Sequence, residues 1–110
     1  MAFEVVLTPD FKKELKHIAK KHRHILNDVQ KLIAQLAVNP KIGSDLGQGI
    51  YKLRIAISGT SKGKSGGARV ITYLKIQKET IILVDIYLKS EFDTVSTDMI
   101  LDKLKDQGFI

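Results

Sequence analysis

The chain has 110 residues, 44% hydrophobic and 27% charged, a size and balance typical of one soluble globular domain over residues 1–110. It contains no cysteine, which excludes disulfides and thiolate metal sites and fits a reducing compartment. The longest uninterrupted apolar run, Ile81–Val84, is far too short to cross a bilayer, and the N-terminal residues lack a signal-peptide pattern. We therefore expect a cytoplasmic protein without membrane association.

The positive charge is concentrated in the middle of the chain. The formal net charge is +6, and residues 46–78 carry seven basic side chains and no acidic one. Because such a stretch has no internal ion-pair partner, its field points outward toward an anion, unless it forms only a solvated lysine-rich surface. Lysine outnumbers arginine among the cations, which disfavours a protein that reads a DNA sequence.

The first half of the chain predicts a strand followed by two helices. Residues 2–7 are short and β-prone, and Thr8 with Pro9 marks a helix start, with Thr8 as the N-cap. After a break at residues 21–24, a second helix ends at Asn39-Pro40, because the residue before proline disfavours helical angles. Helical spacing supports both helices; the apolar positions are Phe11, Leu15, Ile18 and Ala19, then Ile25, Val29, Leu32, Ile33 and Leu36.

The second half predicts three strands and a helix. Residues 50–57 alternate as a half-buried strand with its cations facing outward, and residues 58–67 read as a loop. Two further β-branched runs, residues 68–76 and 80–88, are joined by a polar turn, and residues 94–105 form a helix with Ser96 as N-cap. The order βααβββα predicts an α+β domain in which helices, including the N-terminal helical hairpin, pack on one face of an antiparallel meander sheet.

The glycine-rich segment SGTSKGKSGGARV, residues 58–70, allows three interpretations. A nucleotide-binding P-loop is disfavoured, because Ser58 stands where the motif needs its first glycine and a strand, not a helix, follows. A flexible hairpin tip explains the glycines and serines. A loop that meets a polyanion also explains Lys62 and Lys64, since two lysines without a counter-charge repel each other and stabilise nothing internally.

The segments KGKSGGARVITY (62–73) and IYLKSE (86–91) resemble the RelE/ParE toxin superfamily, and within it the HigB-like branch related to phage Gp49 proteins. The element order, Asn39-Pro40 and the basic strand segment KLR (52–54) agree with this resemblance. It implies a RelE-like fold and a toxin of a type II toxin–antitoxin system, neutralised by a cognate antitoxin. It also implies a ribosome-dependent mRNA endonuclease that works in the ribosomal A site and needs no metal or other cofactor. Two alternatives stay open: a ParE-like inhibitor of DNA gyrase, and a catalytically silent module that binds RNA or the antitoxin.

The resemblance implies cleavage by attack of a ribose 2′-OH on the adjacent phosphate. This reaction needs a proton acceptor, charge stabilisation of the phosphorane and an acid for the leaving 5′-oxygen, and each acid or base role contributes about 10²–10⁴-fold. Cations can stabilise the phosphorane, arginine can contact a phosphate through two hydrogen bonds, and a lysine with a depressed pKa could act as the base. The candidate catalytic residues are Lys62, Lys64, Arg69, Tyr87 and Lys89, and the candidate RNA-binding residues are Lys52, Arg54, Tyr73 and Phe92.

The aromatic candidates and the histidines have alternative explanations. Tyr73 and Tyr87 lie in apolar strands, where a tyrosine usually belongs to the core, and Tyr87 is the better candidate because Lys89 shares its face. Many RelE-like nucleases have a tyrosine shortly after the last strand. This chain has Phe92-Asp93-Thr94-Val95 there, so the acid is left unidentified, although Phe92 could stack on a base. The three histidines near residues 17–24 are expected on the surface, and no metal site is expected.

Overall fold

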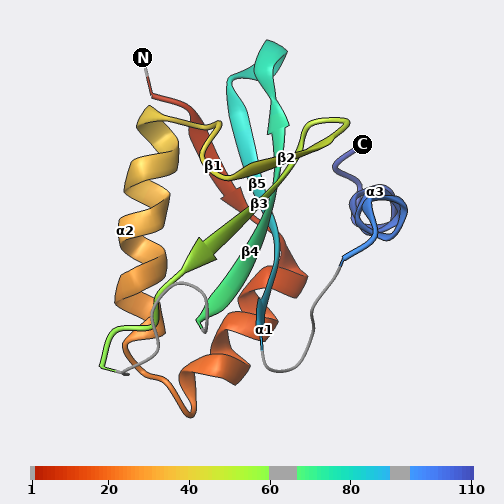
Figure 1. The fold of residues 1–110 in the computed structure, drawn as a ribbon. Helices are drawn as coiled ribbons and strands as arrows, with labels where there is room; N and C mark the ends of the chain where they lie inside the picture. Colours follow the sequence, from red (N-terminus) through yellow and green to blue (C-terminus); the bar gives the residue numbers. More distant parts are fainter. Residues whose placement is uncertain (1, 60–66, 90–94) are drawn as a thin grey trace.

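The protein is described by a computed structural model, in which residues 2–59, 67–89 and 95–110 are placed. A five-stranded sheet in the order β1-β5-β4-β3-β2 lies between helices α1 and α2 on one face and α3 on the other (Figure 1). The elements in chain order are β1 (Glu4–Leu7), α1 (Pro9–Ala19), α2 (Ile25–Val38), β2 (Ser44–Gly47), β3 (Ile50–Ile55), β4 (Ala68–Lys75), a 3₁₀ turn (Ile76–Lys78), β5 (Thr80–Leu88) and α3 (Thr97–Asp106).

The expected α+β order is confirmed, and one short strand adds to it. The segment Ser44–Gly47 pairs with β3 as an edge strand, although its sequence SDLG has neither alternation nor β-branched residues. Such a strand is stabilised by its ladder to a neighbour and not by its own propensity. The other bounds agree with the sequence to within a few residues at their ends.

The sheet is mostly antiparallel, and β1 is the exception to the expected meander. β1 pairs in parallel with β5, with Glu4 opposite Thr80 and Leu7 opposite Leu83. A parallel pair needs a long connection, and here the whole of α1, α2 and three strands separates the two partners in sequence. The pair therefore brings the N-terminal strand to the edge of the sheet beside the last strand.

Helix α1 starts where the sequence indicates. The Thr8 hydroxyl accepts a hydrogen bond from the Phe11 amide at 3.0 Å, and Pro9 takes the first helical position. The apolar stripes of α1 and α2 cover one face of the sheet. Their buried side chains include Phe11, Ile18, Val29 and Leu36, which pack in one cluster with alternate residues of β4 and β5.

The expectation that all helices share one face of the sheet is wrong for α3. Its buried residues Ile100 and Leu104 pack with Ile50, Ile71 and Ile82, which point away from α1 and α2. The amphipathic pattern of a helix predicts that one side is buried, but it contains no information on which sheet face supplies the partner. Ser96 precedes α3 as expected, yet its side chain makes no capping hydrogen bond.

Candidate nucleic-acid interface

Three neighbouring strands bring two arginines and a tyrosine into one row. In the strand register Arg54 of β3 lies opposite Arg69 of β4, and Arg69 lies opposite Tyr87 of β5. Directly paired residues of antiparallel strands point to the same face, and strands lie about 4.8 Å apart. The three residues, called the cross-strand row below, therefore span about 10 Å on the face that α3 also covers.

Two further candidates lie beside the cross-strand row. Lys52 points to the same face one pair further along β3, opposite Ile71. Lys89 follows β5, and its backbone amide donates to the Gly67 carbonyl at 3.1 Å, which ties it to the start of β4 near Arg69. Four of the candidate cations thus lie at one end of the sheet: Lys52, Arg54, Arg69 and Lys89.

These side chains differ in how far they reach the surface. Arg54 and Lys89 are exposed and Lys52 is half-buried, whereas Arg69 and Tyr87 are each only 5% exposed. A guanidinium N–H of Arg69 donates to the Ala68 carbonyl at 3.3 Å. A polyanion that approaches this face would meet Arg54 and Lys89 first, and Arg69 would form the floor of the site.

Gly67 permits the close approach of β3 and β4 beside the row. A Cβ at this position would lie 2.1 Å from the Ile55 carbonyl oxygen, well inside the distance that any side chain tolerates. Only glycine therefore allows the start of β4 to pack directly on the end of β3. This contact helps to hold Arg69 in register with Arg54.

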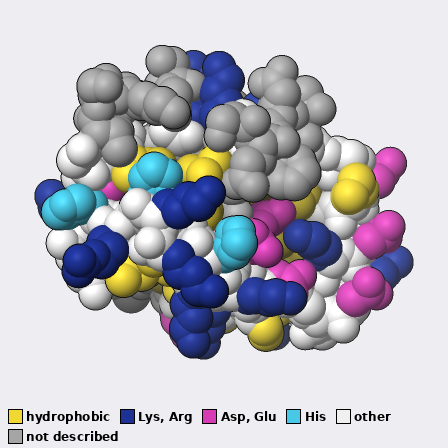
Figure 2. Space-filling model, turned by 90° about the horizontal axis from the view of Figure 1, so that it is seen from below, with side chains coloured by type: hydrophobic (Ala, Val, Ile, Leu, Met, Phe, Trp, Pro, Cys, Tyr) yellow, Lys and Arg dark blue, Asp and Glu magenta, His cyan; other side chains and the backbone are white. Residues whose placement is uncertain are grey.

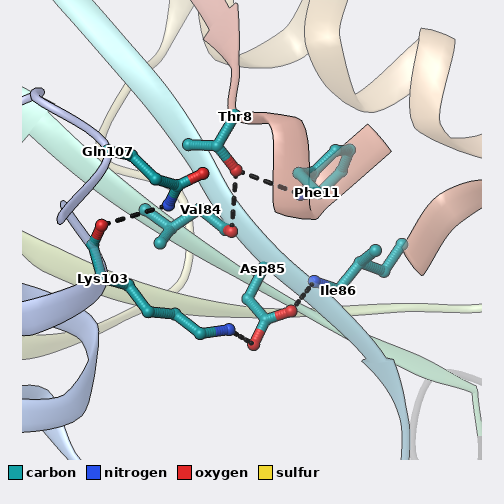
Figure 3. A network of polar contacts seen from close by, with 7 residues as sticks. All are labelled: Thr8, Phe11, Val84, Asp85, Ile86, Lys103 and Gln107. Atoms are coloured by element: carbon teal, nitrogen blue, oxygen red, sulfur yellow. Dashed lines mark hydrogen bonds and ion pairs between the residues drawn. The ribbon is translucent and has the colours of Figure 1, made fainter. Parts of the chain in front are cut away.

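A β-bulge in β5 determines which face Tyr87 occupies. Ile71 pairs with Asp85 and Thr72 pairs with Leu83, so Val84 is an extra residue in β5. The Thr8 hydroxyl donates to the Val84 carbonyl at 3.1 Å (Figure 3). Beyond the bulge, the alternation is shifted, which moves Tyr87 to the α3 face.

The bulge also places the carboxylate of Asp85 on the α3 face. One of its oxygens accepts from the Ile86 amide at 2.9 Å and the other contacts the Lys103 ammonium of α3 at 3.1 Å (Figure 3). Asp85, Tyr87 and Lys103 line a cavity of about 450 Å³ whose walls come from α1, β5 and α3. The sequence does not indicate this ion pair, since nothing in the spacing relates residue 85 to residue 103.

The remaining candidates do not join the cross-strand row. Tyr73 shares its face but lies opposite Ile50, further along β4, where its ring packs against Gly49. Lys62, Lys64 and Phe92 lie outside the described residues. Their proposed roles stay predictions.

The loop that follows β3 is fixed at its first residues by α2. Both carboxylate oxygens of Asp28 accept hydrogen bonds from Ser58, one from its amide at 2.9 Å and one from its hydroxyl. Gly59 packs against the ring of His24, which leaves no room for a Cβ. The sequence contained no signal for this contact, because its partners are 30 residues apart.

The described residues offer no group of three or more His, Cys, Asp or Glu able to hold a metal ion. The histidines lie at the surface as expected, with His17 and His24 exposed and His22 half-buried. Within the placed part of the chain, no helix has the length and apolar character needed to cross a membrane.

Comparisons with known proteins place this fold and chain in a family. Two E. coli structures have the same fold: a RelE toxin mutant in the free state, with a TM-score of 0.62 and 14% identity, and the isolated RelE toxin, with a TM-score of 0.60 and 12% identity. Each alignment covers 96% of this chain and 98% of the other. A family model described as the RelE toxin of the RelE/RelB toxin–antitoxin system matches residues 10–106. Since this match covers most of the sequence, the chain belongs to the RelE toxin family.

Proposed function

We propose that this toxin is a ribosome-dependent mRNA endonuclease that inhibits translation in the cytoplasm. The cross-strand row is the observation that carries the proposal: Arg54, Arg69 and Tyr87 share one face of the sheet, with Lys52 and Lys89 beside them. Like charges directly opposite each other on a sheet destabilise it, and an anion between them removes the repulsion. The pairing of two arginines therefore fits a site for a phosphate.

The proposed reaction starts with attack of a ribose 2′-oxygen on the neighbouring phosphorus. The 2′-OH loses its proton to a base, the P–O5′ bond breaks, and the 5′-oxygen takes up a proton, which leaves a 2′,3′-cyclic phosphate and a 5′-OH. Arg54 and Lys89 are exposed and would contact the non-bridging phosphate oxygens, while Arg69 stabilises the phosphorane charge from below. Tyr87 is the candidate for the proton donor, and Lys62 and Lys64 are candidates for further charge stabilisation.

A second basic surface lies on α1 and the turn after it. Seen from below, lysine and arginine side chains gather with histidines on this side of the molecule (Figure 2). We propose that it contacts the ribosomal RNA backbone, a contact that is independent of sequence and weakens as salt rises. The exposed cations of this surface are Lys12, Lys13, Lys16, Lys20, Lys21 and Arg23.

The family implies a cognate antitoxin partner. We place the chain on the HigB-like branch because of the segments 62–73 and 86–91. A neighbouring gene that encodes a small helix-turn-helix protein, and whose product abolishes toxicity, would support this assignment.

The test is induction of the toxin, followed by pulse labelling of protein and DNA synthesis and primer extension on a translated message. We expect protein synthesis to stop and new 5′ ends to appear within codons. Arg54→Gln and Lys89→Gln should remove both effects, whereas Lys78→Gln, the same charge change at an exposed position at the other end of the sheet, should not. Continued translation with accumulating DNA breaks would instead indicate a gyrase inhibitor. Harmless expression with retained RNA affinity would indicate a silent binding module.

A further inference from the structure

Asp85 is an acidic residue next to the cross-strand row, and Asp10 and Glu14 of α1 line the same cavity from the other side. The strands β3, β4 and β5 are placed in full, and Asp85 is the only carboxylate among their residues. It lies on the α3 face, two residues before Tyr87 and opposite Ile71. Its side chain is 18% exposed and lines the same cavity as Tyr87.

A negative charge in this position opposes the proposed binding of a phosphate. Alternate residues of a strand lie about 7 Å apart, so a phosphate held at Tyr87 would be about that far from Asp85. Asp85 cannot easily turn away, because one carboxylate oxygen is held by the Ile86 amide at 2.9 Å. Its charge therefore has to be neutralised where it stands.

Lys103 supplies that neutralisation from α3. Its ammonium lies 3.1 Å from the second carboxylate oxygen, and its backbone carbonyl accepts from the Gln107 side-chain amide at 3.1 Å (Figure 3). We infer that Lys103 is a positioning residue of the proposed RNA site, which acts by screening Asp85 so that a phosphodiester can occupy the cross-strand row. This inference rests on the proposed function.

The ion pair contributes little to holding α3 in place. Ile100 and Leu104 are 1% and 0% exposed and attach the helix to the sheet, whereas a partly exposed ion pair contributes little to stability. Loss of the Lys103 charge should therefore leave α3 packed on the sheet, so that any change in RNA affinity reports the unscreened charge of Asp85. Lys103→Met keeps most of the aliphatic stem and removes only the ammonium.

The test measures the affinity of the purified protein for a short, fluorescein-labelled RNA whose 2′-hydroxyls are all methylated, so that cleavage cannot interfere. We expect Lys103→Met to weaken binding about three- to eightfold at low salt, from Coulomb repulsion over about 7 Å in a largely aqueous medium. Lys103→Arg should bind like the wild type. Lys105→Met removes an exposed cation from the same helix and should change the affinity less than about twofold.

The decisive variant is the double substitution Asp85→Asn with Lys103→Met. Removal of the Asp85 carboxylate should restore binding to within about twofold of the wild type, since the charge that Lys103 screens is then gone. Asp85→Asn alone, in which the amide oxygen can still accept from Ile86, should bind at least as tightly as the wild type. A merely structural ion pair would lower the free energy of urea unfolding in Lys103→Met together with the affinity, whereas the proposed role lowers the affinity alone.

Three results would overturn the inference: a double variant as weak as Lys103→Met, an equal loss in Lys105→Met, or a wild type without measurable RNA affinity. The outcome is separable from that of the proposed function, because the binding assay does not depend on cleavage. If the rescue is seen but translated messages stay intact, the endonuclease proposal fails and the role of Lys103 stands. In a ribosome assay, the same substitution should raise KM and leave kcat unchanged.

Discussion

The opposed arginines of the cross-strand row should make the free protein less stable than it could be. Arg54 and Arg69 are direct partners in the β3–β4 ladder, so their side chains leave the same face of the sheet from neighbouring positions. Coulomb repulsion at about 7 Å with an effective dielectric constant of 40–80 is about 0.5–1 kcal/mol, the range known for cross-strand pairs. We therefore expect Arg54→Gln to raise the free energy of unfolding by about that amount and the Tm by about 2–5 °C.

The measurement is thermal and urea unfolding at low and at high salt. The gain should shrink at 1 M salt, where the screening length falls to about 3 Å. Lys52→Gln is the matched control, because it removes a cation from the same strand and face but lies opposite the apolar Ile71. If Arg54→Gln fails to stabilise the protein at low salt, or Lys52→Gln stabilises it equally, the repulsion between Arg54 and Arg69 is refuted.

Three further substitutions test the supports of the site. Thr8→Val removes both hydrogen bonds of a fully buried hydroxyl and should lower the free energy of unfolding in urea by about 2–3 kcal/mol. Thr8→Ser keeps the hydroxyl and should lower it much less, and equal losses for the two variants would contradict a role for the hydroxyl. Gly67→Ala places a Cβ 2.1 Å from a β3 carbonyl oxygen and should lower the free energy of unfolding by about 2 kcal/mol or more. If this variant is as stable as the wild type, the close approach of β3 and β4 is not required. Asp28→Ala frees Ser58 and should speed hydrogen exchange at the Ser58 amide at least tenfold; unchanged protection there would exclude the carboxylate as its partner.

The local part of the fold could be predicted from the sequence because its causes are local. Thr8 and Pro9 specify a helix start through a hydroxyl and a fixed φ angle, and both act within one turn. The apolar spacing of the two N-terminal helices indicates which of their sides is buried, and Phe11 and Leu36 are indeed fully buried. The same spacing on α3 could not indicate the sheet face on which it packs.

The parts that could not be predicted depend on pairs of residues distant in sequence. The parallel pairing of β1 with β5 joins residues 76 positions apart, and the ion pair between Asp85 and Lys103 depends on the face that α3 selects. The row of Arg54, Arg69 and Tyr87 needs the exact strand register, whereas the sequence predicts only that each strand alternates. The sequence therefore predicts the region of the sheet in which the cations lie, but not which of them are neighbours.

The bulge in β5 is a change of strand register that the sequence does indicate. Ile81 and Leu83 pack under α1 and α2, so an unbroken alternation would bury Asp85 and Tyr87 in the same apolar cluster. A carboxylate in that position would lose its hydration without a partner, which costs several kcal/mol. The strand avoids this by the extra residue Val84, whose carbonyl is held by Thr8. A charged residue that strict alternation assigns to a core therefore indicates a shift of register, and here the shift moves Tyr87 to the proposed RNA site.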